Sequence, residues 1–199
     1  HVLGPWRVRK LAGELHIVRI FLEKERRLAV RLATHLPRVC SVVAAHAIDA
    51  VHRKTRVLAV YRYGNLVLDI HGGPNGAFYD SFVPLQQVLA TSGYLVLAVN
   101  PRGSSTYGND FMMAVLGDWG GEDYKDLMAA VDELCARPYV DSERLGVHGY
   151  SYGGYMTSWA VGHTNRFKAA VVGAPCTNLH SMYGTSDIGI SFGEAQWGG

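Results

Sequence analysis

The feature that most constrains this chain is an alternation of short apolar runs and amphipathic segments from residue 66 onward. Four runs rich in apolar residues are each closed by glycine, proline or a polar turn, as expected for buried strands. They span residues 66–70, 94–99, 144–148 and 169–173. The segments between them place apolar residues at helical spacing, over 82–89, 124–135 and 155–160. Strands that alternate with helices in this way predict an α/β fold with a doubly wound, mostly parallel sheet.

The first third of the chain differs in charge from the rest. Residues 1–66 carry 13 Lys/Arg against 4 Asp/Glu, whereas residues 67–199 carry 6 against 13. We therefore divide the chain into a basic segment, 1–65, and the start of an α/β domain, 66–199. In the basic segment one helix is predicted from apolar residues at helical spacing, and two strands from short β-branched runs. The helix positions are Leu11, Leu15, Val18 and Leu22, and the strands span 39–45 and 57–61.

Composition excludes several classes of protein. With 48% hydrophobic and 18% charged residues the chain is expected to be globular rather than disordered. Its apolar runs fall short of the roughly 20 residues that cross a bilayer, so we expect no membrane partner. The basic residues of 1–65 are interleaved with aliphatic ones and form no nucleic-acid-binding motif, so no nucleic-acid partner is expected. The three cysteines form no CxxC pair, which favours a reducing, cytoplasmic setting and no disulfide framework.

One short motif carries candidate chemistry. Residues 149–153 read GYSYG and fit G-x-S-x-G, the nucleophile elbow of α/β-hydrolases. In that motif a tight turn from strand to helix exposes a strained serine above the edge of the sheet. A glycine-rich structural turn is the alternative, but here a predicted strand precedes the motif and a predicted helix follows it. We therefore take Ser151 as the candidate nucleophile.

A serine nucleophile needs a base to accept its proton and N–H donors for the oxyanion of the tetrahedral intermediate. In an elbow one donor is the backbone N–H after the serine, which here belongs to Tyr152. The second comes from a loop after an earlier strand, where residues 71–74 read HGGP. Glycine leaves its N–H accessible, and we choose Gly73, although Gly-Gly-Pro is also ordinary turn chemistry.

Several motifs in series resemble the prolyl oligopeptidase family of serine peptidases. They are HGGP at 71–74, NPRGS at 100–104 with YG at 107–108, DWGG at 118–121 with Asp123 and Asp126, and GYSYGGY at 149–155. Their order is similar to that of the acylaminoacyl-peptidase and dipeptidyl-peptidase branch, and the resemblance covers about residues 66–199. Residues 1–65 match nothing in the family.

The resemblance implies an α/β-hydrolase catalytic domain that cleaves short peptides or acyl-peptides without a cofactor. It implies that Ser151 is the nucleophile and that the amides of Gly73 and Tyr152 form the oxyanion hole. Related enzymes of this kind release an acylated residue or a dipeptide from the N-terminus of a peptide. A carboxylesterase of the same fold and a non-catalytic binding module remain alternatives, and a homo-oligomer is possible.

The other two members of a catalytic triad are expected after residue 199. In these folds the order is Ser, then Asp or Glu, then His, each after a later strand. After 169–173 there is too little sequence for two more strand–helix units, so the sheet is expected to stop before its last strands. His163 lies 12 residues after Ser151, about 18 Å along a helix, and His148 lies inside a strand. His71 and His180, the latter in a late loop near Asp187, are expected to shape loops or face solvent.

An acidic cluster and an arginine follow the third motif. Asp118, Glu122, Asp123 and Asp126 resemble a metal site, but the last two lie one turn apart at a predicted helix start, where acids suit the helix dipole. We therefore expect no metal. Arg102 is expected to pair with an acid and brace its loop.

Overall fold

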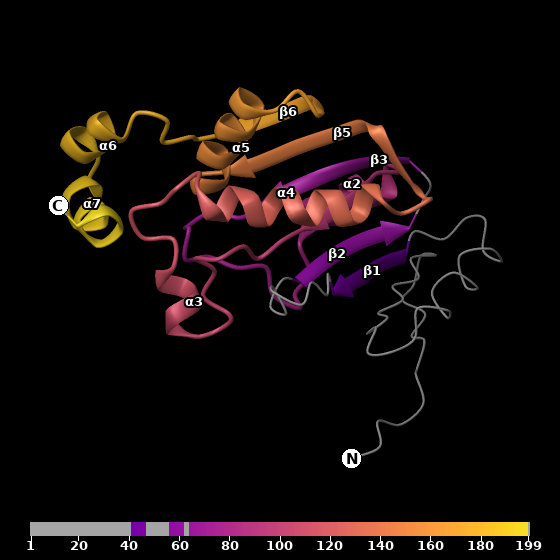
Figure 1. Ribbon diagram of the computed structural model, residues 1–199, viewed down its shortest axis with the longest axis horizontal. Coiled ribbons are helices and arrows are strands. Elements are labelled where there is room, and N and C mark those ends of the chain that lie inside the picture. Colours follow the sequence, from indigo (N-terminus) through magenta and orange to yellow (C-terminus); the bar gives the residue numbers. More distant parts are fainter. Residues whose placement is uncertain (1–40, 47–55, 62–63, 199) are drawn as a thin grey trace, which may run out of the picture.

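The computed structural model describes residues 41–46, 56–61 and 64–198 of the chain. Within them six strands form one sheet in the order β1-β2-β4-β3-β5-β6 (Figure 1). Strands β1, β2 and β4 pair antiparallel, whereas β4, β3, β5 and β6 pair parallel. The strands are β1 Ser41–His46, β2 Arg56–Tyr61, β3 Gly64–Ile70, β4 Leu95–Ala98, β5 Val140–Tyr150 and β6 Phe167–Gly173.

This sheet confirms the predicted doubly wound, mostly parallel architecture. The two strands expected at 39–45 and 57–61 are present as β1 and β2, with bounds shifted by a residue or two. The helix expected around Leu11 to Leu22 lies outside the described residues. The order of the sheet places β3 between β4 and β5, so β3 is a central strand. The loop that follows β3 therefore starts at the centre of the side of the sheet where the parallel strands end.

The two central strands form because their apolar residues lose all contact with water. Every residue of β4 is buried, and Leu66, Leu68 and Ile70 of β3 are at most 1% exposed. Leu68 pairs with Leu97 on one side and with Val147 of β5 on the other. Since burial of each such side chain contributes about 1.5–3 kcal/mol, this layer stabilises the centre of the sheet.

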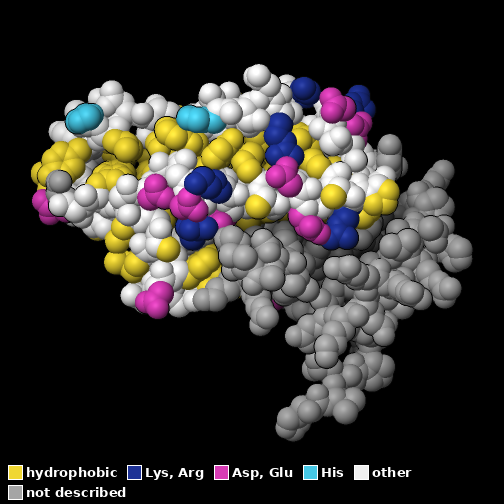
Figure 2. All heavy atoms as spheres, viewed as in Figure 1, with side chains coloured by type: hydrophobic (Ala, Val, Ile, Leu, Met, Phe, Trp, Pro, Cys, Tyr) yellow, Lys and Arg dark blue, Asp and Glu magenta, His cyan; other side chains and the backbone are white. Residues whose placement is uncertain are grey.

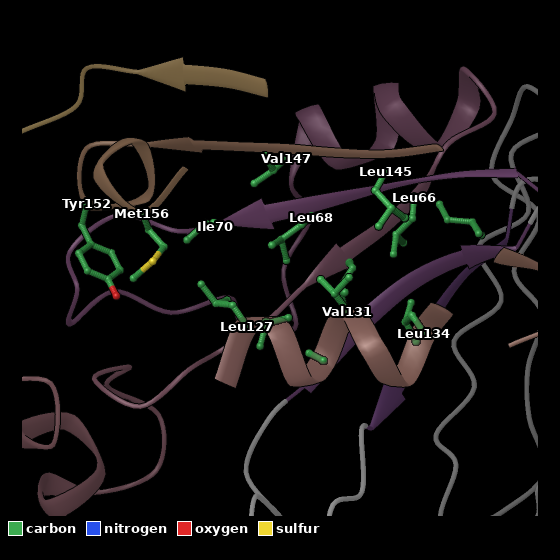
Figure 3. Close-up of a cluster of buried hydrophobic side chains, with 14 of the residues drawn as sticks. Leu66, Leu68, Ile70, Leu127, Val131, Leu134, Leu145, Val147, Tyr152 and Met156 are labelled. Carbon is green, nitrogen blue, oxygen red and sulfur yellow. The ribbon is translucent and has the colours of Figure 1, made fainter. Parts of the chain in front are cut away.

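Two helices cover one face of the sheet. Helix α4, Glu122–Cys135, directs Leu127, Val131 and Leu134 toward β3 and β5, as the helical spacing predicted (Figure 3). Helix α5, Tyr152–His163, adds Tyr152 and Met156 to the same cluster. Helices α4 and α5 are therefore packed on one shared hydrophobic core.

Helix α2, Pro84–Thr91, lies behind the sheet in Figure 1 and differs from its prediction. Its spacing predicted an apolar face that included Leu85 and Val88, but these side chains are 51% and 59% exposed. The buried positions are Gln86 and Ala90, because the Gln86 amide donates to the buried carboxylate of Asp69 at 2.8 Å. A buried polar pair thus decided which face turned inward.

Three further helices were not predicted. They are α3 Asn109–Met113, α6 Leu179–Thr185 and α7 Gly189–Trp197. Helix α7 packs Phe192 and Trp197 edge-on against Trp119, with ring centroids 5.9 Å and 4.9 Å away. In the described part of the chain no helix is long and apolar enough to cross a membrane.

Candidate functional site

Ser151 stands at the junction of β5 and α5, as the elbow motif predicted. Strand β5 ends at Tyr150, helix α5 begins at Tyr152, and Ser151 between them has φ 61° and ψ −120°. A non-glycine residue at positive φ costs on the order of 1–3 kcal/mol and persists only where its surroundings enforce it. Among the described residues only Ala174 shares this property, so the strain is concentrated at the elbow and just after β6.

Glycines around Ser151 allow that turn, because neighbouring backbone segments pass each other there at very short range. A methyl group on Gly149 would lie 2.4 Å from the carbonyl oxygen of Gly153, and one on Gly153 would lie 2.1 Å from that of Ile70. Gly154 makes the same kind of approach to β6, where the Gly173 carbonyl would be 2.2 Å away. The Gly173 carbonyl also accepts the Ser151 N–H at 2.9 Å. The backbone of the elbow therefore packs closely against the ends of β3 and β6.

The predicted oxyanion loop comes directly after β3 and reaches the elbow. A methyl group on Gly72 would lie 3.5 Å from the Cβ of Ser151. Gly73 has φ 124°, and a side chain there would lie 2.3 Å from the amide nitrogen of Gly76. The sequence prediction named Gly73 and missed the close approach of Gly72, whose only signal was its place in the same motif. The loop thus lies beside Ser151, and the N–H groups of Gly73 and Tyr152 stay the predicted donors.

His71, at the head of this loop, serves as a loop-shaping residue, as expected. Its side chain is buried, with Nε2 2.9 Å from the Ser104 hydroxyl and Nδ1 2.8 Å from the Gly72 carbonyl oxygen. The ring also meets Phe78 edge-on at 5.3 Å. Burial lowers the pKa of His71, so the ring favours its neutral form. Its two ring nitrogens contact Gly72 in this loop and Ser104 in the loop after β4, rather than Ser151.

The other three histidines considered as bases are also placed elsewhere. His163 stacks on Trp159 at 4.0 Å at the far end of α5, and its Nδ1 hydrogen-bonds the Trp159 carbonyl. His148 lies within β5, with Nε2 3.4 Å from Asp69 Oδ1. His180 was predicted in a loop, which is wrong, because it lies exposed in α6. Among the described residues none hydrogen-bonds the Ser151 hydroxyl.

Arg102 braces its loop against α4, as predicted. Its Nε and Nη2 each donate to one carboxylate oxygen of Asp126 at 2.8 Å, and its backbone N–H adds a third bond at 3.0 Å. These hydrogen bonds raise the pKa of Arg102, so its guanidinium is charged at any ordinary pH. Around it Glu122 and Lys125 form an exposed ion pair, and Figure 2 shows acidic and basic side chains side by side over the start of α4.

Asp123, the next acid of the cluster, is buried and fully engaged. Its Oδ1 accepts the backbone N–H groups of Gly120 and Tyr124 at 2.9 Å and 2.7 Å. Its Oδ2 accepts the hydroxyl of Tyr152 at 2.5 Å. Burial raises the pKa of Asp123 despite these donors. Within the described ranges no three His, Cys, Asp or Glu side chains come together as a metal site.

Comparison with known proteins agrees with this geometry. The model of the prolyl oligopeptidase family matches residues 81–199, more than half of the chain. The chain is 53% identical over 132 residues to the peptidase YuxL of Bacillus subtilis and 38% identical over 137 residues to dipeptidyl-peptidase 5 of Schizosaccharomyces pombe. These matches cover 66% and 64% of this chain but only 20% of each relative, so the chain spans about a fifth of their length.

A solved structure also matches. The acylaminoacyl peptidase of Pyrococcus horikoshii superposes with a TM-score of 0.68 at 35% identity, over 70% of this chain and 24% of that one. The parallel sheet and its helices correspond to the α/β-hydrolase fold of such a catalytic domain.

Proposed function

The chain belongs to the prolyl oligopeptidase family, and on this premise we propose that its protein is a serine peptidase that cleaves short peptides or acyl-peptides through an acyl-enzyme on Ser151. The observation that carries the proposal is the strained Ser151 at the β5–α5 junction, beside the glycine loop that follows β3. Membership alone would allow a protein that has lost its activity. A strained serine beside a glycine loop is the arrangement in which an α/β-hydrolase presents its nucleophile and its oxyanion donors.

The proposed reaction has two steps. In the first, Ser151 Oγ attacks the scissile carbonyl carbon, a base accepts the serine proton and passes it to the leaving amine, and an ester forms on Ser151. In the second, water attacks that ester and releases the acyl product. The N–H groups of Tyr152 and Gly73 would stabilise the oxyanion in both steps. We propose that the base, a histidine, and its acidic partner lie beyond residue 199.

Substrate class follows from the relatives. We propose release of an acylated residue or a dipeptide from a peptide N-terminus, since relatives of this chain include a dipeptidyl-peptidase and an acylaminoacyl peptidase. The described cysteines, Cys135 and Cys176, are free thiols, which suits a reducing compartment, and we propose the cytoplasm.

The test is a substrate panel on the purified full-length protein and its Ser151→Ala variant. The panel holds an N-acetylated amino-acid p-nitroanilide, a dipeptidyl p-nitroanilide and p-nitrophenyl acetate. Peptide or acyl-peptide turnover that is lost in Ser151→Ala supports the proposal. Turnover of the simple ester alone would indicate a carboxylesterase, and no turnover of any of the three would indicate a non-catalytic protein.

A further inference from the structure

The residue after the candidate nucleophile is held by its side chain as well as by its helix. Tyr152 is 1% exposed, its ring meets Trp119 edge-on at 4.9 Å, and its hydroxyl donates to Asp123 at 2.5 Å. Burial, together with the nearby carboxylate of Asp123, raises the pKa of Tyr152 well above 10, so the hydroxyl keeps its proton and donates. The side chain therefore has one fixed position.

The backbone N–H of the same residue is free. Tyr152 is the first residue of α5, and the first four N–H groups of a helix have no acceptor within it. No other group among the described residues accepts this N–H either. The strained backbone of Ser151 sets where the N–H points, and the next fixed point along the chain is the Tyr152 side chain.

Asp123 is itself immobile. Two backbone N–H groups at the start of α4 hold its Oδ1, and the side chain is 1% exposed. Helix α4 is in turn packed on the central strands through Leu127 and Val131 (Figure 3). The carboxylate thus links the rigid core of the domain to the residue that carries a predicted oxyanion donor.

We propose that Asp123 is a positioning residue for the reaction, which by holding the Tyr152 hydroxyl fixes the direction of the Tyr152 N–H. The inference rests on the proposed function, because it assigns the N–H to the oxyanion hole. Because Asp123 is only 1% exposed, it would act on the reaction through Tyr152. Its contribution should therefore appear in the transition state, where the oxyanion forms, and not in substrate binding.

The test uses three single variants and one double variant of the full-length protein. Tyr152→Phe removes only the hydroxyl, Asp123→Asn weakens its acceptor, and the double variant combines them. Tyr155→Phe is the matched control, because Tyr155 lies one turn later in α5 and its hydroxyl also makes a buried bond, to the Trp119 carbonyl at 3.0 Å. For each we measure kcat, KM, and the affinities of a substrate-like competitor and of a peptide boronate that forms a tetrahedral adduct on serine.

Complete loss of an oxyanion donor costs about 10²–10³ in kcat, and a misdirected donor should cost less, about 10-fold or more. We expect Tyr152→Phe and Asp123→Asn to lower kcat and boronate affinity by such a factor while KM and competitor affinity change little. The double variant should be no worse than the worse single one, since both break the same bond. Tyr155→Phe should retain wild-type kcat.

Two results would overturn the inference. One is a kcat and a boronate affinity in Tyr152→Phe that match those of Tyr155→Phe. The other is a loss in Tyr152→Phe that appears equally in the competitor affinity, which would indicate general disruption of the site. If Asp123→Asn fails to fold, as judged by circular dichroism, Tyr152→Phe decides alone. An inactive wild-type protein would instead refute the proposed function itself.

Discussion

Replacing Gly153 with alanine would place a methyl group against the central strand of the sheet. The new Cβ would lie 2.1 Å from the carbonyl oxygen of Ile70 and 3.0 Å from that of His71. Real Cβ atoms essentially never approach other atoms closer than 3.0 Å, so the two backbones must separate by about 0.9 Å. Both atoms that would be displaced belong to backbone, which leaves no flexible side chain to move aside.

This displacement has a cost in stability and in activity. Overpacking of this kind costs about 1–3 kcal/mol, and alanine in a helix returns at most about 1 kcal/mol of that. The displaced segment also begins the predicted oxyanion loop, and a misplacement near 1 Å at a reacting centre can cost about 100-fold in rate. We therefore expect a lower free energy of unfolding and a rate of serine labelling reduced by one to two orders of magnitude.

Gly162 is the matched control in the same helix. A methyl group there would meet nothing within 4 Å, so Gly162→Ala should leave stability unchanged or raise it by about 0.4–1 kcal/mol. Urea denaturation followed by circular dichroism compares the three proteins, and labelling by a fluorophosphonate compares their serines. Equal stability and equal labelling of Gly153→Ala and Gly162→Ala would refute the close packing of the elbow against β3.

Three further predictions follow from the braces and the edge of the sheet. Arg102→Ala should lower the free energy of unfolding by about 2 kcal/mol because the Asp126 carboxylate loses its charged donor, a figure discounted for the 24% exposure of the Arg102 side chain. Lys125→Ala at its exposed ion pair should leave that free energy nearly unchanged, so equal denaturation midpoints for the two variants would contradict the prediction. Burial raises the pKa of Asp123 above 3.8 in the folded state, so the folded state binds this proton more tightly than the unfolded state, and the free energy of unfolding of wild type relative to Asp123→Asn should rise as pH falls from the raised pKa toward 3.8. Urea midpoints measured at two pH values in this range would exclude the prediction if they showed the opposite trend. The purified 199-residue chain should self-associate through β6, where Val171 is 69% exposed. Val171→Lys should reduce the mass measured by light scattering, and an unchanged mass would contradict association through β6.

The parallel core was predictable because its signal is local. The runs that became β3 and β4 are apolar enough to be buried on both faces, and each is closed by a turn that its own residues specify. The elbow was predictable for the same reason, since G-x-S-x-G between a strand and a helix describes its own backbone. In both cases the residues that decide the conformation lie next to one another in the sequence.

Contacts between distant segments were not predictable. The buried face of α2 depends on a hydrogen bond between Gln86 and Asp69, 17 residues apart, which periodicity cannot show. Helix α7 is held by Trp119 and by the bond from the Trp119 indole to Gln196, 77 residues apart. The partner of Tyr152 was hidden in the same way, because Asp123 looked like one more acid at a helix start. These positions depend on contacts between residues far apart in the chain, and a single sequence does not show which distant residues pair.

Labelling of the full-length protein by a fluorophosphonate, with the modified peptide identified by mass spectrometry, tests the central role of Ser151 most directly. We predict one adduct, on the peptide that contains Ser151, and its loss in Ser151→Ala. Ser158→Ala, in the same helix α5, should label at the wild-type rate. Wild-type labelling of Ser151→Ala, or an adduct on another serine, would contradict the assignment of Ser151 as the nucleophile.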